Sequence, residues 1–161
     1  MMFWRRPAVT LRPAAIADCD ALSEVHASAF RRGWSDAEFE SLLVQPGVHA
    51  LLACHRNWFG REAAIGFILY RLAAEEAEVL AVAVAPDYRR RGVGRQLMEE
   101  AMRHAYREGA GEIHLEVEDT NSAAIALYRD IEFRESGRRT GYYAQERETP
   151  GGALVMVRQL R

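Results

Sequence analysis

Apolar and polar residues repeat along this chain with two periods, one typical of strands and one typical of helices. Seven segments have the apolar content of strands: 8–12, 48–54, 64–72, 78–85, 113–118, 133–142 and 153–160. The continuous apolar run at 79–84 is typical of a strand covered on both faces. Residues 113–118 alternate strictly, so the polar side chains of His114, Glu116 and Glu118 share one face.

Apolar residues spaced for a helix predict four helices between these strands. One spans about 15–30, and a second opens at the capping pair Ser35 and Glu38 and stops at Pro46-Gly47. The others span about 93–108, ending at Gly109, and about 122–131. The order β-α-α-β-β-β-α-β-α-β-β predicts an α/β fold around a mixed sheet. With no repeat or linker, residues 1–161 are expected to form a single domain.

The composition supports a globular protein and excludes several kinds of chemistry. The chain has 161 residues, 49% hydrophobic and 27% charged, with a net charge of −2, so we expect neither nucleic acid nor a membrane as partner. All 21 basic residues are arginine, which excludes a Schiff-base lysine and a phosphate-loop lysine. Cys19 and Cys54 lie far apart and residues 1–7 lack the apolar run of a signal peptide, so we expect a cytoplasmic protein without a disulfide.

The segment after the most apolar strand is the most informative part of the sequence. It reads Pro-Asp-Tyr-Arg-Arg-Arg-Gly-Val-Gly-Arg over residues 86–95 and leads into a helix. A helix start offers free backbone N–H groups and partial positive charge, and Gly92 and Gly94 let an anion approach the backbone. The pattern predicts a diphosphate cradle without lysine or metal. The alternatives for this segment are a solvated basic turn and a nucleic-acid-binding patch. A dinucleotide-binding fold fits poorly, because the sequence lacks the motif G-x-G-x-x-G.

Four stretches together resemble one enzyme family over most of the chain. They are Arg89-x-x-Gly92-x-Gly94, Leu115-Glu116-Val117 followed by the segment 121–128, the segment 138–143, and residues 30–43 with Gly33-Trp34-Ser35. In these motifs the chain resembles the GNAT superfamily of acetyltransferases, most closely the RimI-type ribosomal-protein alanine N-acetyltransferases. The resemblance implies a mixed, mostly antiparallel sheet of about seven strands flanked by four helices.

The same resemblance implies a binding site for acetyl-CoA and a second site for an acceptor amine. The implied cofactor-binding residues are Val82, Ala83, Val84, Arg89, Arg90, Arg91, Gly92, Val93, Gly94, Arg95 and Asn121. Of these, 82–84 would contact the acetyl and pantetheine portion through the backbone, and 90–95 would hold the pyrophosphate. Trp34, Tyr142 and Tyr143 would border the acceptor. We expect no metal, because the five histidines show no ligand spacing.

Acetyl transfer to an amine needs a base for the amine proton, a donor for the thioester oxygen and an acid for the leaving thiolate. By resemblance, Glu116 is the base and Tyr128 the acid. Glu118 shares the face of Glu116, and the sequence does not separate the two. Tyr128 could instead be a packed helical aromatic residue. The oxygen donor is expected to be a backbone N–H near 82–84.

The chain departs from the family at residue 132, where glutamate replaces the usual glycine after the fourth helix. Glu132 must either adopt a left-handed backbone or end the helix in another way. The leading functional hypothesis is acetylation of a protein N-terminus with a small first residue, possibly that of a small-subunit ribosomal protein. One alternative is acetylation of a small-molecule amine. The other is a non-catalytic acetyl-CoA sensor, and the presence of Glu116 and Tyr128 argues against this second alternative.

Overall fold

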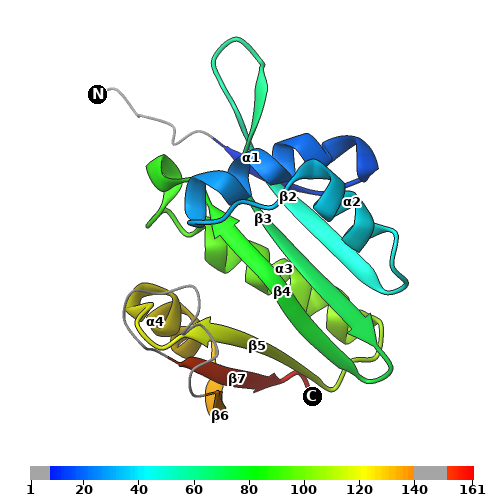
Figure 1. The fold of residues 1–161 in the computed structure, drawn as a ribbon, viewed down its shortest axis with the longest axis vertical. Helices are drawn as coiled ribbons and strands as arrows, with labels where there is room; N and C mark the ends of the chain where they lie inside the picture. Colours follow the sequence, from blue (N-terminus) through cyan, green and yellow to red (C-terminus); the bar gives the residue numbers. More distant parts are fainter. Residues whose placement is uncertain (1–7, 140–151) are drawn as a thin grey trace. The chain divides into compact units, whose positions relative to one another are not determined.

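The computed structural model describes residues 8–139 and 152–161, and every predicted helix and strand is present there (Figure 1). The elements in chain order are β1 Val9–Pro13, the 3-10 turn η1 Ile16–Asp18, α1 Cys19–Ala29, α2 Asp36–Leu43, β2 Val48–Arg56, β3 Glu62–Ala73, β4 Glu76–Val84, the 3-10 turn η2 Pro86–Tyr88, α3 Val93–Arg107, β5 Glu112–Glu118, α4 Ser122–Asp130, β6 Arg134–Arg139 and β7 Ala153–Gln159. No helix among these residues is long and apolar enough to cross a membrane.

The seven strands follow the order β1-β2-β3-β4-β5-β7-β6, which confirms a mixed and mostly antiparallel sheet. β4 and β5 pair in parallel, and there Glu76–Glu78 lie opposite Glu112–His114. The chain divides into two compact units, one made of residues up to 71 and 80–101, the other of 72–79 and 102–161. The expectation of a single domain stays a prediction, and each unit is described in turn.

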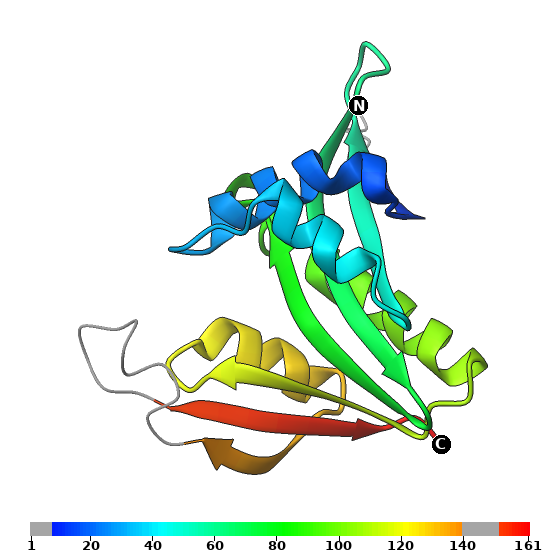
Figure 2. The same ribbon diagram turned by 45° about the vertical axis from the view of Figure 1, so that its right-hand side comes forward.

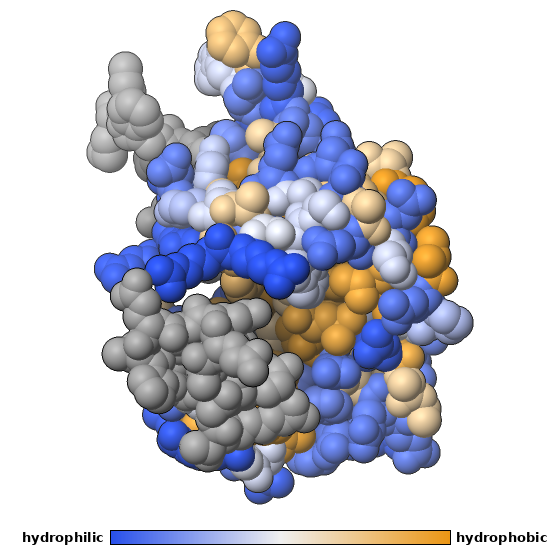
Figure 3. Space-filling model, viewed as in Figure 1, coloured by the Kyte–Doolittle hydropathy of each residue, from blue (hydrophilic) through white to orange (hydrophobic). Residues whose placement is uncertain are grey.

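In the first unit, α1 and α2 bury their apolar residues against one face of β2 and β3 (Figures 1 and 2). Leu22, Phe39 and Phe67 are fully buried in this core. Burying each of these side chains stabilises the fold by roughly 1.5–3 kcal/mol. On the face of the molecule that Figure 3 shows, hydrophilic residues (blue) are interspersed with hydrophobic ones (orange).

The other face of β3 meets the start of α3 at Gly66. A Cβ at Gly66 would lie 3.0 Å from the carbonyl oxygen of Ala83 and 3.3 Å from a methyl group of Val93. A side chain at this position would require the neighbouring backbone or α3 to shift by a few tenths of an ångström, so glycine suits this close approach. This contact sets the distance between the sheet and the helix that carries the arginine–glycine loop.

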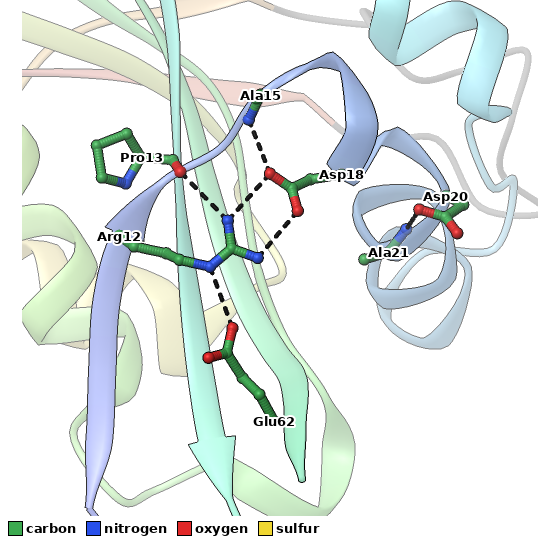
Figure 4. A network of polar contacts seen from close by, with 7 residues as sticks. All are labelled: Arg12, Pro13, Ala15, Asp18, Asp20, Ala21 and Glu62. Carbon is green, nitrogen blue, oxygen red and sulfur yellow. Dashed lines mark hydrogen bonds and ion pairs between the residues drawn. The ribbon is translucent and has the colours of Figure 1, made fainter.

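A polar network joins the end of β1 to the following turn and to β3 (Figure 4). The guanidinium of Arg12 donates two hydrogen bonds to Asp18, of 3.0 and 2.9 Å, and a third of 3.1 Å to Glu62. The hydrogen bonds from Arg12 hold the pKa of the Asp18 carboxyl below its ordinary value. Asp18 also accepts the N–H of Ala15 at 2.8 Å, so one carboxylate fixes the turn that begins α1.

In the second unit, the alternation predicted for β5 is confirmed. Ile113, Leu115 and Val117 are buried, whereas the polar residues between them are half-buried. β5 pairs with β7, and Leu115 lies opposite the buried Met156. α4 contributes Ile125 to the buried apolar side chains of this unit.

Glu132 takes the left-handed backbone that glycine usually supplies at the end of such a helix, with φ at 73°. Its N–H donates to Arg129 O at 3.0 Å, and the N–H of Phe133 donates to Tyr128 O at 2.9 Å. The Glu132 side chain is largely exposed and pairs with Arg158 at 3.1 Å. An exposed ion pair contributes little, so backbone strain dominates at this position.

We therefore expect Glu132→Gly to leave the free energy of unfolding unchanged or to raise it by up to about 1 kcal/mol. Glu132→Ala is the matched control, because it loses the ion pair with Arg158 but keeps the strained backbone. Thermal unfolding should place the glycine variant above the alanine variant by a few degrees. A glycine variant that melts clearly below both the alanine variant and the wild type would show that the ion pair dominates.

Candidate active site

The turn from β4 to α3 contains two left-handed residues, at Arg90 and at Gly92. Their φ angles are 61° and 80°. A Cβ at Gly92 would meet nothing within 4 Å, so glycine is needed there for its backbone angle, not for space. Arg90 adopts the same region at an energetic cost, and such strain is characteristic of functional turns.

The first amides of α3 follow directly on this turn. The first intrahelical hydrogen bond runs from the N–H of Gln96 to Gly92 O at 3.0 Å. The N–H groups of Val93, Gly94 and Arg95 therefore precede the first intrahelical donor. Alternating left-handed residues direct successive N–H groups to one side, and the helix dipole adds positive potential there.

The arginines of the turn have different structural roles. Arg89 donates from Nε to the carbonyl oxygen of Val84 at 3.2 Å, which braces the turn against the end of β4. The guanidinium of Arg91 lies 5.4 Å from the ring centroid of Tyr88. Arg95 pairs with Glu99 at 3.0 Å, one helical turn further on. Arginine side chains thus both support the turn and supply its positive charge.

A cavity of about 500 Å³ lies beside this turn within the first unit. It is lined by Val9, His55, Tyr88, Arg90, Arg91, Val93 and Gln96. Two cationic side chains and a half-buried histidine make its lining suited to an anion. Tyr88 belongs to the segment 86–95 that the sequence singled out, whereas sequence reasoning did not find His55, which meets the loop only through the fold.

The last residues of β4 lead directly into the turn. Ala83 is buried, whereas Val82 and Val84 are half-buried. The N–H of Ala85 donates to Ile65 O at 2.7 Å, which ties the strand end to β3. The segment 82–84 and the loop 89–95 thus both lie in the first unit, where the 3-10 turn η2 joins them.

The second unit holds the candidate base. Glu116 lies opposite Val155 in the β5–β7 ladder, and Glu118 lies opposite Ala153. Both carboxylate residues are half-buried and share the polar face with His114. The two glutamates therefore remain equivalent candidates by burial and by face.

The candidate acid Tyr128 lies on α4 with 6% of its surface exposed. Its ring centroid is 5.9 Å from that of Phe133, so the ring also packs in the core. Burial raises the pKa of the Tyr128 phenol to about 12. The hydroxyl therefore keeps its proton at neutral pH, as an acid must.

Asn121 is the N-cap of α4, and its Oδ1 accepts the N–H of Ala124 at 3.2 Å. The Asn121 side chain therefore already has a structural role as a helix cap. Any contact between Asn121 and a cofactor would be made in addition to this bond. The residue lies in the second unit together with Glu116 and Tyr128.

Trp34 lies in the loop between α1 and α2 and is half-buried. Together with Glu38, Ser41 and Leu42 it lines a second cavity of about 240 Å³. The other two predicted acceptor residues, Tyr142 and Tyr143, lie outside the described residues.

Ser23 and His26 are functional candidates that sequence reasoning missed. Both side chains hydrogen-bond to the backbone of Trp34. The available signal was His26 itself, a polar residue one helical turn after the buried Leu22, on the apolar face of α1. Across the described residues, no cluster of three metal-ligating side chains is present.

Comparison with known proteins identifies similar chains with a named activity. The model of the Acetyltransferase (GNAT) family matches residues 19–133. The [Ribosomal protein bS18]-alanine N-acetyltransferase of Escherichia coli K12 is 31% identical over 134 residues, covering 83% of this chain and 86% of that protein. The N-alpha-acetyltransferase RimI of Mycobacterium tuberculosis H37Rv is 34% identical over 137 residues, covering 84% of each chain.

A solved structure shares the fold over nearly the whole chain. The crystal structure of the ribosomal-protein-S18-alanine N-acetyltransferase from Escherichia coli superimposes with a TM-score of 0.82 at 26% identity. The match covers 95% of this chain and 94% of that one.

We expect the buried Tyr128 to be recognisable by its ionisation. Because its pKa in the folded protein is about 12, against about 10 for a free phenol, this residue lowers folding stability as the pH rises from about 10 to 12. Alkaline titration followed by tyrosine absorbance should show a late step that Tyr128→Phe removes. Tyr106→Phe, which alters an exposed tyrosine, should keep that step. If Tyr128→Phe instead removed a titration step near pH 10, the raised pKa assigned to Tyr128 would be contradicted.

Proposed function

The chain belongs to the GNAT family of acetyltransferases, and from this premise we propose that it transfers the acetyl group of acetyl-CoA to the α-amine of a protein N-terminus. The observation that carries the proposal is the left-handed turn at Arg90 and Gly92, which leaves the first amides of α3 beside arginine side chains. The relatives named for acetylation of a ribosomal-protein alanine support an N-terminus as the acceptor. We propose a cytoplasmic location, where two buried free thiols are common.

In this proposal, acetyl-CoA supplies the activated thioester, and its diphosphate is held by backbone and arginine groups. The N–H groups of Val93, Gly94 and Arg95 donate to the phosphate oxygens, and Arg90 and Arg91 provide full charges. Metal is not needed for this, because the helix start and the guanidinium groups supply the positive potential. The backbone of 82–84 is assigned to the acetyl and pantetheine portion, and Asn121 to a further contact.

Glu116 is proposed to accept a proton from the acceptor amine. An α-amine has a pKa near about 8 and a lysine amine near about 10.4, so a single carboxylate suffices only for the first. The half-buried position of Glu116 on β5 allows both access and partial desolvation. Glu118 on the same face is the alternative base.

Tyr128 is proposed to donate its phenolic proton to the leaving thiolate sulfur. The raised pKa supports this role, because the proton is present at every pH at which the enzyme would act. The phenolate formed would be reprotonated from water before the next cycle. The packing of its ring beside Phe133 holds the hydroxyl in place.

The acceptor is proposed to lie beside Trp34, and the other two predicted acceptor residues, Tyr142 and Tyr143, lie outside the described residues. Trp34 lines a cavity of about 240 Å³, too small for more than part of a peptide. A small first residue, such as alanine, suits a narrow space of this kind. A ribosomal protein is the proposed source of this N-terminus.

Two substitutions should have different kinetic signatures. Glu116→Gln should lower turnover by about 100-fold below the pKa of the amine, with partial recovery at high pH where the amine is already neutral. Tyr128→Phe should lower turnover at all pH values and leave acetyl-CoA binding nearly intact, because the ring still packs. Glu118→Gln is the matched control and should retain activity. Wild-type turnover in both Glu116→Gln and Tyr128→Phe would remove these residues from catalysis, and Glu118 would be the next base to test.

One peptide with a free alanine N-terminus and an internal lysine tests the acceptor. The two amines differ by about 2.4 pKa units, or roughly 3 kcal/mol in the cost of deprotonation, so we expect the α-amine to react at least 100 times faster. Mass spectrometry after partial reaction with acetyl-CoA locates the acetyl group. A matched peptide that begins with a bulky residue should react more slowly. Modification confined to lysine, or to free small-molecule amines added to the mixture, would reject the N-terminal proposal and favour the alternative acceptors.

A further inference from the structure

The backbone of Trp34 is held at both of its polar groups by side chains of α1. Its N–H donates to Nδ1 of His26 at 3.0 Å, and its carbonyl oxygen accepts the hydroxyl of Ser23 at 2.6 Å. Ser23 and His26 are three residues apart and therefore lie on the same side of the helix. Two hydrogen bonds to side chains of one helix thus fix the peptide groups on both sides of Trp34 in the α1–α2 loop.

The ring of His26 is itself fixed by aromatic neighbours. It is 3% exposed and stacks on Phe30, with ring centroids 4.3 Å apart, and on Trp34, with centroids 4.6 Å apart. Phe39 and Phe67 complete the surroundings at 5.8 and 6.2 Å. An apolar ring would fill this space without the cost of burying a polar group, so packing alone does not account for histidine here.

The other end of the loop is fixed by the cap of α2. Ser35 accepts the N–H of Glu38 at 3.2 Å, and the carboxylate of Glu38 accepts the N–H of Ser35 at 2.7 Å. Trp34 is therefore held on one side by Ser23 and His26 of α1, and on the other side it is bonded to Ser35, the N-cap of α2. Trp34 and Glu38 both line the 240 Å³ cavity, so the geometry of this cavity depends on the two anchors.

We propose that Ser23 and His26 are positioning residues that hold the Trp34 loop in the conformation that receives the acceptor. This rests on the proposed function, in which Trp34 borders the acceptor amine. In this proposal Ser23 and His26 do not touch the reacting atoms, and they act through the backbone N–H and C=O groups of Trp34. Their loss should weaken acceptor binding while acetyl-CoA binding is unchanged.

We call the two hydrogen bonds from Ser23 and His26 to the backbone of Trp34 the clamp. The clamp also makes the loop sensitive to pH, because a protonated imidazole carries hydrogen on both nitrogens and no longer accepts the N–H of Trp34. Burial lowers the pKa of His26, and the carboxylate of Glu38 on α2 acts in the opposite direction. The other contacts of the His26 ring are with uncharged aromatic rings, those of Phe30, Trp34, Phe39 and Phe67. His26 is therefore neutral at pH 7, and the clamp is lost only as the pH falls below the ordinary value of about 6.5.

Three variants separate the hydrogen bonds from the packing. His26→Phe keeps an aromatic ring but removes the acceptor, whereas His26→Asn places an oxygen near the position of Nδ1. Ser23→Ala removes the bond to the carbonyl and changes the least volume. Ser28→Ala is the matched control, because Ser28 lies on the same helix and donates to Val25 O at 2.7 Å.

Two measurements test the clamp, one on the loop and one on the reaction. Hydrogen exchange of the Trp34 amide should accelerate about fivefold or more in His26→Phe and in Ser23→Ala, and remain near wild type in His26→Asn and Ser28→Ala. The KM for an N-terminal peptide should rise by a similar factor in the first two variants, with kcat and acetyl-CoA binding little changed. Below pH 6.5 the KM of the wild type should rise more steeply than that of His26→Asn.

Unchanged exchange of the Trp34 amide in both Ser23→Ala and His26→Phe would overturn the clamp, whatever the acceptor. Faster exchange with an unchanged peptide KM would also overturn the proposal, because the loop would then not position the acceptor. The proposed function fails separately, if the wild type itself does not acetylate the peptide. Recovery by His26→Asn excludes a general loss of stability as the cause.

Discussion

The left-handed backbone at Arg90 and Gly92 is the constraint on which the candidate cofactor site depends. It turns the chain from the end of β4 into the start of α3 within a few residues, and the N–H groups of 93–95 precede that of Gln96, which donates to Gly92 O. Gly66 permits the close contact of α3 with β3, and Arg89 braces the turn on the carbonyl of Val84. The charge of this site comes from side chains, but its shape comes from the backbone.

Sequence periodicity predicted the elements of this fold well, because each has a strong local signal. The strict alternation in 113–118 and the capping pair Ser35 and Glu38 both appear in the structure as expected. Strand ends were less predictable: β2 continues to Arg56, and its pairing with β3 shifts register between Ala53 and Cys54. Such details depend on contacts between strands, which periodicity does not report.

The candidate site was predictable where it is continuous in the sequence and not where it is assembled by the fold. The loop 89–95 was predicted to be a cradle in which glycine lets an anion approach the backbone, and the structure adds that Gly92 has a left-handed backbone angle. His55, which lines the cavity beside the loop, and the anchors Ser23 and His26 were not identified. These residues became candidates through contacts with neighbours 8 to 33 positions away, and the sequence alone does not show such pairs.

The proposed cradle can be examined residue by residue with nuclear magnetic resonance of the ¹⁵N-labelled protein during addition of acetyl-CoA. The amide signals of Val93, Gly94 and Arg95, together with those of 90–92, should show the largest shifts in the first unit, and a chelator should leave these shifts unchanged. Saturable binding of acetyl-CoA that leaves the amides of 90–95 unmoved would contradict the cradle. Shifts that disappear with the chelator would show that a metal is required.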